Sequence, residues 1–227
     1  NTNVLVRYLK SFKKRFFVAG SIETPSSAID VTTGKVKPMS NWLPDAAAFV
    51  QYQWADGQHV RLSGIVRSLS YLTMADNRSH NLAGWGVQLS AVGRPEGHLS
   101  AFGTFNYGQG YAGLGSDLLY GSYDLVPEPG NPSALYAPTS FGWCAGLQYN
   151  FLPNLLVSIS ASQTRYLPKN GISGDEYKYG TFCCANILWN IIPRVTVGAE
   201  YDRGRRKNFS GADGDAQRFN VSTMFTF

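Results

Sequence analysis

The last ten residues, 218–227, alternate between two kinds of side chain with a period of two. One set suits contact with lipid: Phe219, Val221, Thr223, Phe225 and Phe227. The other set suits water: Arg218, Asn220, Ser222, Met224 and Thr226. A ten-residue amphipathic strand with an aromatic residue at its end predicts the closing strand of a transmembrane β-barrel. The alternative is the last strand of a soluble sandwich.

The same alternation predicts eleven strands in one continuous domain, residues 1–227, with no linker and no helical stretch. The expected strands are 4–10, 15–23, 46–54, 59–71, 82–93, 97–108, 140–149, 155–165, 178–190, 195–203 and 216–227. The predicted fold class is therefore all-β, a transmembrane antiparallel up-and-down β-barrel.

The connections between these strands are expected to alternate in length. Short ones fall at 11–14, 55–58, 94–96, 150–154 and 191–194. Long ones fall at 24–45, 72–81, 109–139, 166–177 and 204–215. Short turns at one rim and long loops at the other are typical of outer-membrane barrels, whose short turns face the periplasm. A soluble Greek-key sandwich has no reason to sort its loops in this way.

The composition agrees with a membrane barrel. Charged residues are 15% of the chain, which is low for a soluble domain, and aromatic residues are 14%. No window of about 18 uninterrupted apolar residues occurs, so insertion in a membrane requires a barrel rather than a helix. The net charge is +5, but several of the cations crowd one turn, at residues 10–15, so nucleic-acid binding is not favoured. The expected location is the bacterial outer membrane.

The odd number of predicted strands raises a question about the amino-terminal end of the chain. If Phe227 lies at the periplasmic rim, the strand 4–10 runs towards that rim and Asn1 lies outside the cell. Intact bacterial barrels have an even number of strands and begin in the periplasm. An odd number of amino-terminal strands is therefore expected to be absent from this chain. The start at Asn1, without Met or an apolar segment, fits a processed or trimmed chain and leaves targeting unreadable.

Several stretches resemble a known family: Arg15–Pro25 (RFFVAGSIETP), Pro44–Trp54 (PDAAAFVQYQW), Val66–Tyr71 (VRSLSY), Tyr107–Gly110 (YGQG), Glu200–Arg206 (EYDRGRR) and the terminal Phe. Together they are similar to the DcaP-like outer-membrane porins. The resemblance covers essentially the whole chain. It implies a sixteen-stranded barrel, usually trimeric, that passes small anionic solutes such as dicarboxylates. Eleven strands and a missing five would give sixteen, in agreement with the parity.

Two departures weaken the anion preference that this resemblance implies. Gly113 and Leu114 stand where the family tends to have an arginine–tyrosine pair after its G-x-G turn. Phe49 and Gln51 stand where a basic residue is expected to face the lumen.

Pore-lining residues are expected at the alternate strand positions that carry polar side chains, because the charge and the width of the lumen decide the selectivity of a pore. Arg7, Arg61 and Arg67 are predicted to face water and to form a basic ladder. A charge on the lipid face at the midplane costs about 2–4 kcal/mol, which favours this assignment. Glu23, Glu200 and Asp202 are also predicted to point inwards. They either pair with the arginines across the pore or only keep the lumen wet and rigid.

The 31-residue connection 109–139 is too long for a simple hairpin. It either folds into the lumen as a constriction or packs over the mouth, with Tyr111, Asp117 and Tyr120 as its pore-facing candidates. Its Pro-rich part, Val126–Pro132, is expected to be an exposed loop tip.

Other chemistry has little support in the sequence. Cys144, Cys183 and Cys184 lack the spacing of a metal site and are interpreted as small buried residues, so no metal or cofactor is expected. His98 with Ser100 is the only His–Ser pair on one face, and it has no orienting partner for catalysis. The acidic loop pairs 175–176 and 213–215 are interpreted as solvated groups rather than Ca²⁺ ligands.

Three functions therefore remain, in this order: a diffusive porin, a structural or receptor-like barrel within an outer-membrane complex, and a barrel enzyme. The expected partners are outer-membrane lipid, two further copies in a homotrimer and possible other envelope proteins. The barrel assembly machinery is expected to recognise the carboxy-terminal strand, with Phe225 and Phe227 as its insertion signal.

Overall fold

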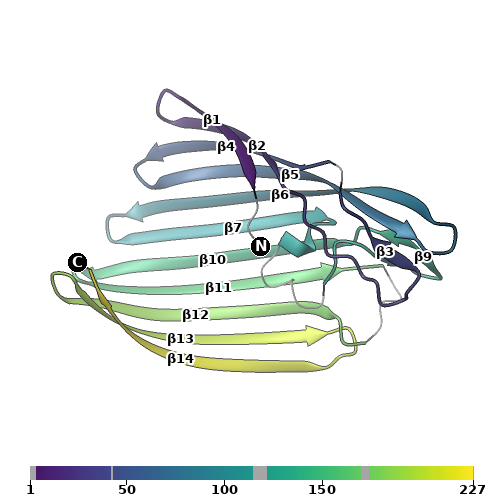
Figure 1. The fold of residues 1–227 in the computed structure, drawn as a ribbon. Helices are drawn as coiled ribbons and strands as arrows, with labels where there is room; N and C mark the ends of the chain where they lie inside the picture. The colour runs from purple at the N-terminus through teal and green to yellow at the C-terminus, as the bar shows by residue number, and fades with distance from the viewer. Residues whose placement is uncertain (1–3, 42, 115–121, 170–173, 227) are drawn as a thin grey trace.

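The computed structural model describes residues 4–41, 43–114, 122–169 and 174–226, and it consists mainly of one antiparallel sheet (Figure 1). Eleven strands follow one another in chain order across this sheet. They are β1 (Leu5–Phe12), β2 (Phe16–Glu23), β4 (Asp45–Ala55), β5 (Gln58–Thr73), β6 (Arg78–Glu96), β7 (Leu99–Gln109), β10 (Thr139–Leu152), β11 (Leu155–Leu167), β12 (Tyr177–Ile192), β13 (Val195–Asn208) and β14 (Asp213–Phe225). The predicted all-β meander and each of its strands are confirmed.

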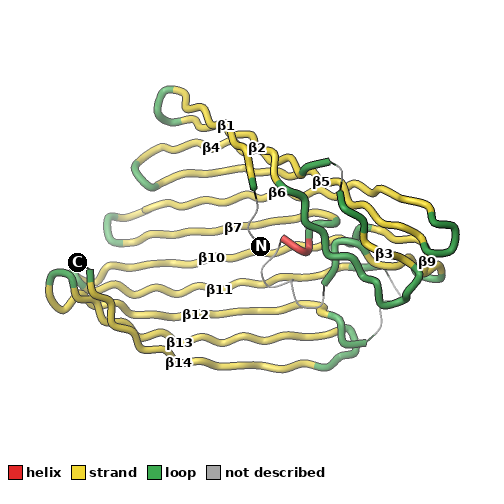
Figure 2. The backbone as a smooth tube through the Cα atoms, in the orientation of Figure 1, coloured by secondary structure: helices red, strands yellow, loops and turns green. Residues whose placement is uncertain are grey.

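Two connections that were expected to be long are hairpin turns. β5 and β6 pair from Val60 and Ala91 up to Thr73 and Arg78, so only residues 74–77 join them. β13 and β14 pair up to Lys207 and Asp213, and residues 209–212 join them. The backbone ladder continues here through polar residues, which do not show the apolar alternation on which the prediction depended. The described parts of the long connections 24–44, 110–138 and 168–176 gather at one end of the sheet (Figure 2).

The long connections contain short elements of their own. β3 (Val36–Pro38) pairs with the end of β5, and β8 (Val126–Glu128) pairs with β9 (Asn131–Tyr136). A single 3₁₀ turn, η1, covers Ala112–Leu114. The expectation of an exposed tip at 126–132 is wrong for Val126, which is fully buried because the β8–β9 hairpin folds back onto the sheet. None of the helices in the described part of the chain is long and apolar enough to cross a membrane.

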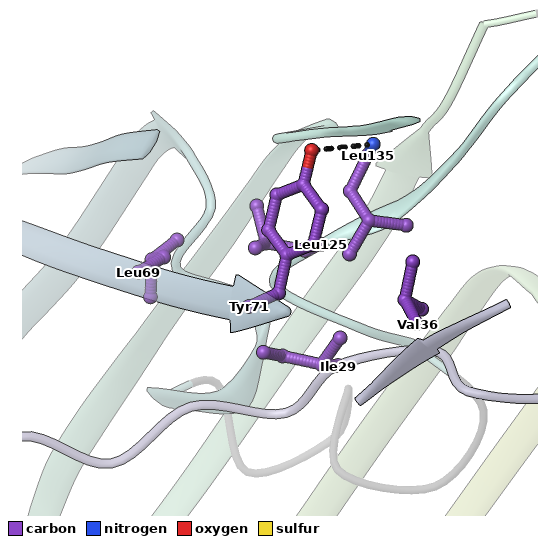
Figure 3. Packing of buried hydrophobic residues seen from close by; sticks show 6 residues of the cluster. All are labelled: Ile29, Val36, Leu69, Tyr71, Leu125 and Leu135. Carbon is purple, nitrogen blue, oxygen red and sulfur yellow. Dashed lines mark hydrogen bonds between the residues drawn. The ribbon is translucent and has the colours of Figure 1, made fainter. Parts of the chain in front are cut away.

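In the described part of the chain, the two clusters of buried hydrophobic residues lie at the end with the long connections. One buried cluster joins Leu69 and Tyr71 of β5 to residues of the two longest connections (Figure 3), namely Ile29, Val36, Leu125 and Leu135. The Leu135 amide donates to the Tyr71 hydroxyl at 3.1 Å. A second cluster consists of Ala112, Val126, Tyr136, Tyr166 and Tyr177. The connections are therefore folded against the sheet and are not free loops.

Most of the sheet, in contrast, is a single layer with large apolar side chains exposed along one face. Val66, Ile159 and Val221 are 60%, 54% and 69% exposed. A soluble sandwich would cover such a face with a second sheet. A layer that separates lipid from water needs no such cover, and this observation favours the membrane interpretation.

Candidate functional site: the polar face of the sheet

The pairing register places all six predicted pore-lining residues on one face of the sheet. Arg7 is opposite Ser21, and Ser21 is opposite Ala47, which faces Ile65 of β5. Residues that are directly opposite each other point to the same face, and the pairing can be followed in this way through β6, β7, β10, β11 and β12 to β13. We call this side the polar face and the opposite side the apolar face. The polar face carries Arg7, Glu23, Arg61, Arg67, Glu200 and Asp202.

Arg61 lies on the polar face, and among the described residues no carboxylate forms an ion pair with it. Its Nε and Nη2 donate to Gln51 Oε1 at 2.9 and 2.6 Å. Its guanidinium lies over the Phe49 ring, 4.5 Å from the centroid. Phe49 and Gln51 occupy positions where the sequence led us to expect a basic residue. The cation is supplied instead by the neighbouring strand, and these two side chains hold it in place.

Arg67 shares this face, but the expectation that it faces water is wrong. Its side chain is 0% exposed and lies in a network of four partners. Nε donates to Asp45 Oδ2 at 3.0 Å, and Nη1 lies 3.2 Å from Asp124 Oδ2. Nη1 also donates to the Gly110 carbonyl at 3.0 Å, and Nη2 donates to the Ser26 carbonyl. Connections 24–44 and 110–138 cover the arginine, so it anchors both of them to the sheet.

Asp124 completes this anchor. It is fully buried, and besides Arg67 it accepts from the amide of Ala28 at 3.0 Å and from that of Gly113 at 2.8 Å. One carboxylate therefore holds connection 24–44 and the turn η1 at the same time. The sequence does not predict this contact, because Asp124 and Arg67 lie in separate predicted elements and no residue pattern links them.

Arg7 and Glu23 lie near each other at the β1 edge of the polar face. Leu5 is opposite Glu23 and Arg7 is opposite Ser21, so the two charged residues are diagonal neighbours on adjacent strands. Glu23 accepts from the Ser21 hydroxyl at 2.7 Å. Within the described residues, no ion pair joins Arg7 to a carboxylate. Both line a pocket of about 380 Å³ that extends across the polar face of β2, β4, β5, β6 and β7.

Glu200 and Asp202 lie at the other side of the sheet, in a hydrogen-bonded group. Arg218 Nε and Nη2 donate to Asp202 Oδ2 at 3.0 and 2.8 Å, so this acid and this cation largely cancel. Asn220 donates to both acids, at 3.2 Å in each case. Cys184 Sγ lies 3.4 Å from Glu200 Oε2. The ligand atoms of Cys184, Glu200 and Asp202 lie within 4.8 Å of one another, a grouping that sequence spacing did not reveal.

The start of connection 110–138 lies on the polar face. The Tyr111 hydroxyl donates to Asn106 Oδ1 at 2.5 Å, and Leu114 lines the same pocket as Arg7 and Thr164. A Cβ at Gly108 would lie 2.2 Å from the Trp85 carbonyl oxygen and 2.8 Å from the Tyr111 ring, so glycine is what allows the ring to sit this close. Tyr111 therefore lies against the polar face of the sheet. Asp117 and Tyr120 lie outside the described residues.

Other predicted groups are found as follows. Phe225 is opposite Val195 on the apolar face and is 61% exposed, while Phe227 lies outside the described residues. The three cysteines are free, and Cys183 is exposed on the apolar face rather than buried. Asp213 is an ion-pair partner of Arg205. His98 and Tyr149 lie with their ring centroids 6.4 Å apart near a short turn.

Glu176 lies among the long connections, outside the strands. Its Oε2 is buried and has no hydrogen-bond partner in the described structure. Burial, with a smaller contribution from the Asp30 carboxylate, raises the pKa of Glu176 to about 6. Asp30 itself is buried and accepts from the amide and the hydroxyl of Thr32. Two acidic groups therefore meet where connections 24–44 and 168–176 approach each other.

These features define a class of architecture, a meander sheet with one apolar and one polar face whose long connections fold over the polar side. Comparison with solved structures identifies the same fold in outer-membrane channels. The outer-membrane channel DcaP of Acinetobacter baumannii matches with a TM-score of 0.76 and 19% sequence identity, over 98% of this chain and 62% of that chain. The chain thus spans about three fifths of the length of that channel.

Two further solved structures match at lower identity. A Pseudomonas aeruginosa FadL homologue matches with a TM-score of 0.52 and 11% identity, over 97% of this chain and 65% of that chain. The NanC porin matches at 9% identity with a TM-score of 0.47, over 99% of this chain and 93% of that chain. No protein-family model and no curated protein sequence matches this chain. The match to the DcaP channel shows that this chain shares the fold of an outer-membrane barrel wall.

Proposed function

We propose that this chain forms the wall of an outer-membrane porin through which small hydrophilic solutes diffuse, with a preference for anions. The observation that carries the proposal is the division of one continuous sheet into an exposed apolar face and a polar face with inward connections. The likeness of the fold to the DcaP channel supports the location in the bacterial outer membrane.

The anion preference depends on Arg7 and Arg61. Each is a cation on the polar face without a carboxylate within ion-pair distance in the described structure. Arg67 contributes less than the sequence suggested, since it is buried against two acids. Arg218 is offset by Asp202. Arg7 and Arg61 attract anions at their positions on the polar face, and Glu23, a diagonal neighbour of Arg7, offsets part of this positive charge.

Closure of the barrel is part of the proposal. β1 and β14 are the two edge strands of the described sheet, and they do not pair with each other. An open edge in lipid leaves backbone N–H and C=O groups without partners, which costs several kcal/mol per group. Each edge therefore pairs with a further strand in the membrane. A homotrimer and insertion by the barrel assembly machinery through the carboxy-terminal strand complete the proposal.

The test is single-channel recording of the protein, purified at full length from its native membrane, under a KCl gradient. We expect conductance steps in multiples of three and a reversal potential on the chloride side. The double variant Arg7→Glu, Arg61→Glu is expected to move the reversal potential towards potassium. The control Arg165→Glu changes a residue of the apolar face, which lies 5.5 Å from the Tyr179 ring, and should leave the selectivity unchanged. A protein without any conductance would instead favour a structural or receptor-like barrel.

A further inference from the structure

We infer that the pocket between β2 and β7 is a binding subsite for small zwitterions, in which Arg7 receives a carboxylate and Glu23 receives an ammonium group. This inference rests on the proposed function, because it assigns a solute class to the lumen. We call the space the Arg7–Glu23 pocket. Its lining includes Ser63, Gln88, Asn106 and Tyr111 in addition to the two charged residues.

The charges of the lining decide the class of ligand. Among the described residues around the pocket, Arg7 and Glu23 are the only charged ones. A dicarboxylate at Arg7 would place its second carboxylate beside Glu23, and a diamine would place an ammonium beside Arg7. Like charges in such a site repel each other. A solute with one charge of each sign meets an attractive partner at both positions.

The spacing of the two charges agrees with this class. Diagonal neighbours on adjacent antiparallel strands have backbones about 7–8 Å apart, and long side chains reach across that distance. Arg7 forms no ion pair with Glu23 in the described structure, so its guanidinium donors remain free for a ligand. The Glu23 carboxylate is fixed by the Ser21 hydroxyl at 2.7 Å, which leaves further acceptor capacity for an ammonium.

The other wall of the pocket is neutral and polar. Ser63, Gln88 and Asn106 come from three consecutive strands, β5, β6 and β7, and lie in one row of the register. Tyr111 holds Asn106 by a 2.5 Å hydrogen bond and, with Leu114, closes the pocket from the side of the long connection. A volume of about 380 Å³ suits a free amino acid or a short peptide.

The test measures equilibrium binding to the full-length protein in detergent by isothermal titration calorimetry, so that it does not depend on conductance. The probes are alanine, N-acetylalanine, which lacks the ammonium, and alaninamide, which lacks the carboxylate. We expect wild-type protein to bind alanine at least tenfold more tightly than either analogue. Glu23→Gln should abolish the preference over N-acetylalanine, and Arg7→Gln should abolish the preference over alaninamide.

Two further variants test whether a loss of selective binding comes from the missing charge or from a general disturbance of the protein. The exchange variant Arg7→Glu, Glu23→Arg should restore the preference for alanine, because it reverses the positions of the charges but keeps both. Arg165→Gln, on the apolar face, should bind as wild type does. Equal binding of the three probes by wild-type protein would overturn the inference, even if the channel conducts. A silent channel that still selects alanine would overturn the proposed function and leave the subsite intact.

Discussion

At the scale of single residues, the environment of an arginine decides its role more than the face of the strand on which it lies. Alternation correctly placed Arg7, Arg61 and Arg67 on one face. It could not show that connections from distant parts of the chain cover Arg67 and that acids at 45 and 124 neutralise it. Such contacts depend on loop conformation, which has no period. Alternation therefore predicts which face of the sheet a strand residue lies on, but near the long connections it does not predict whether that residue is exposed or buried.

Removing the Arg67 side chain should strongly destabilise the protein. Arg67→Met leaves two buried carboxylates without their cation, and breaking a buried ion pair in this way costs about 3–5 kcal/mol. The free energy of unfolding in urea, measured in lipid vesicles, checks this value. Arg61→Met removes a partly exposed arginine with a neutral partner and should cost about 1 kcal/mol. Equal costs for the two variants would show that the Arg67 network is not an anchor.

At the scale of elements, strands were easier to predict than connections. Each of the eleven long strands alternates over most of its length, whereas β3, β8 and β9 are short and pair within or against loops. The hairpins β5–β6 and β13–β14 extend beyond the amphipathic part of their strands, so the alternation of side chains predicts loops at their ends. The composition of a segment does not reveal whether it continues a ladder of backbone hydrogen bonds.

The inward part of connection 110–138 should narrow the passage. Tyr111 projects from it onto the polar face and is largely buried against Gly86 and Gly108. Tyr111→Ala removes this ring and should increase the single-channel conductance. Tyr107→Ala removes a ring from the apolar face, beside Trp85, and should leave the conductance unchanged. A Tyr111 variant with wild-type conductance would place the narrowest point elsewhere.

The contacts among the long connections should weaken as the pH rises from about 4.5 to about 6. The folded protein raises the pKa of Glu176 from 4.5 to about 6, so within this window the folded state binds more protons than the unfolded state. Stability therefore falls with increasing pH. The urea midpoint between pH 4 and pH 7 measures this effect.

A matched pair of variants isolates the contribution of this carboxyl. Glu176→Gln cannot ionise and should flatten the pH dependence within the window. Glu96→Gln changes an exposed acid at a short turn, far from the long connections, and should keep the wild-type slope. If both variants behave alike, Glu176 is not the group responsible.

At the scale of the whole molecule, the division between an apolar and a polar face should determine how the sheet lies in a membrane. Ile159 and Ser160 are adjacent near the middle of β11 and point to opposite faces. An arginine at a lipid-facing midplane position costs about 2–4 kcal/mol, whereas one that faces water in a lumen costs little. Ile159→Arg should therefore lower the free energy of unfolding in vesicles by about 2–4 kcal/mol, and Ser160→Arg should change it by much less. A comparable loss for both would mean that the two faces meet similar surroundings, and the barrel interpretation of the sheet would then be wrong.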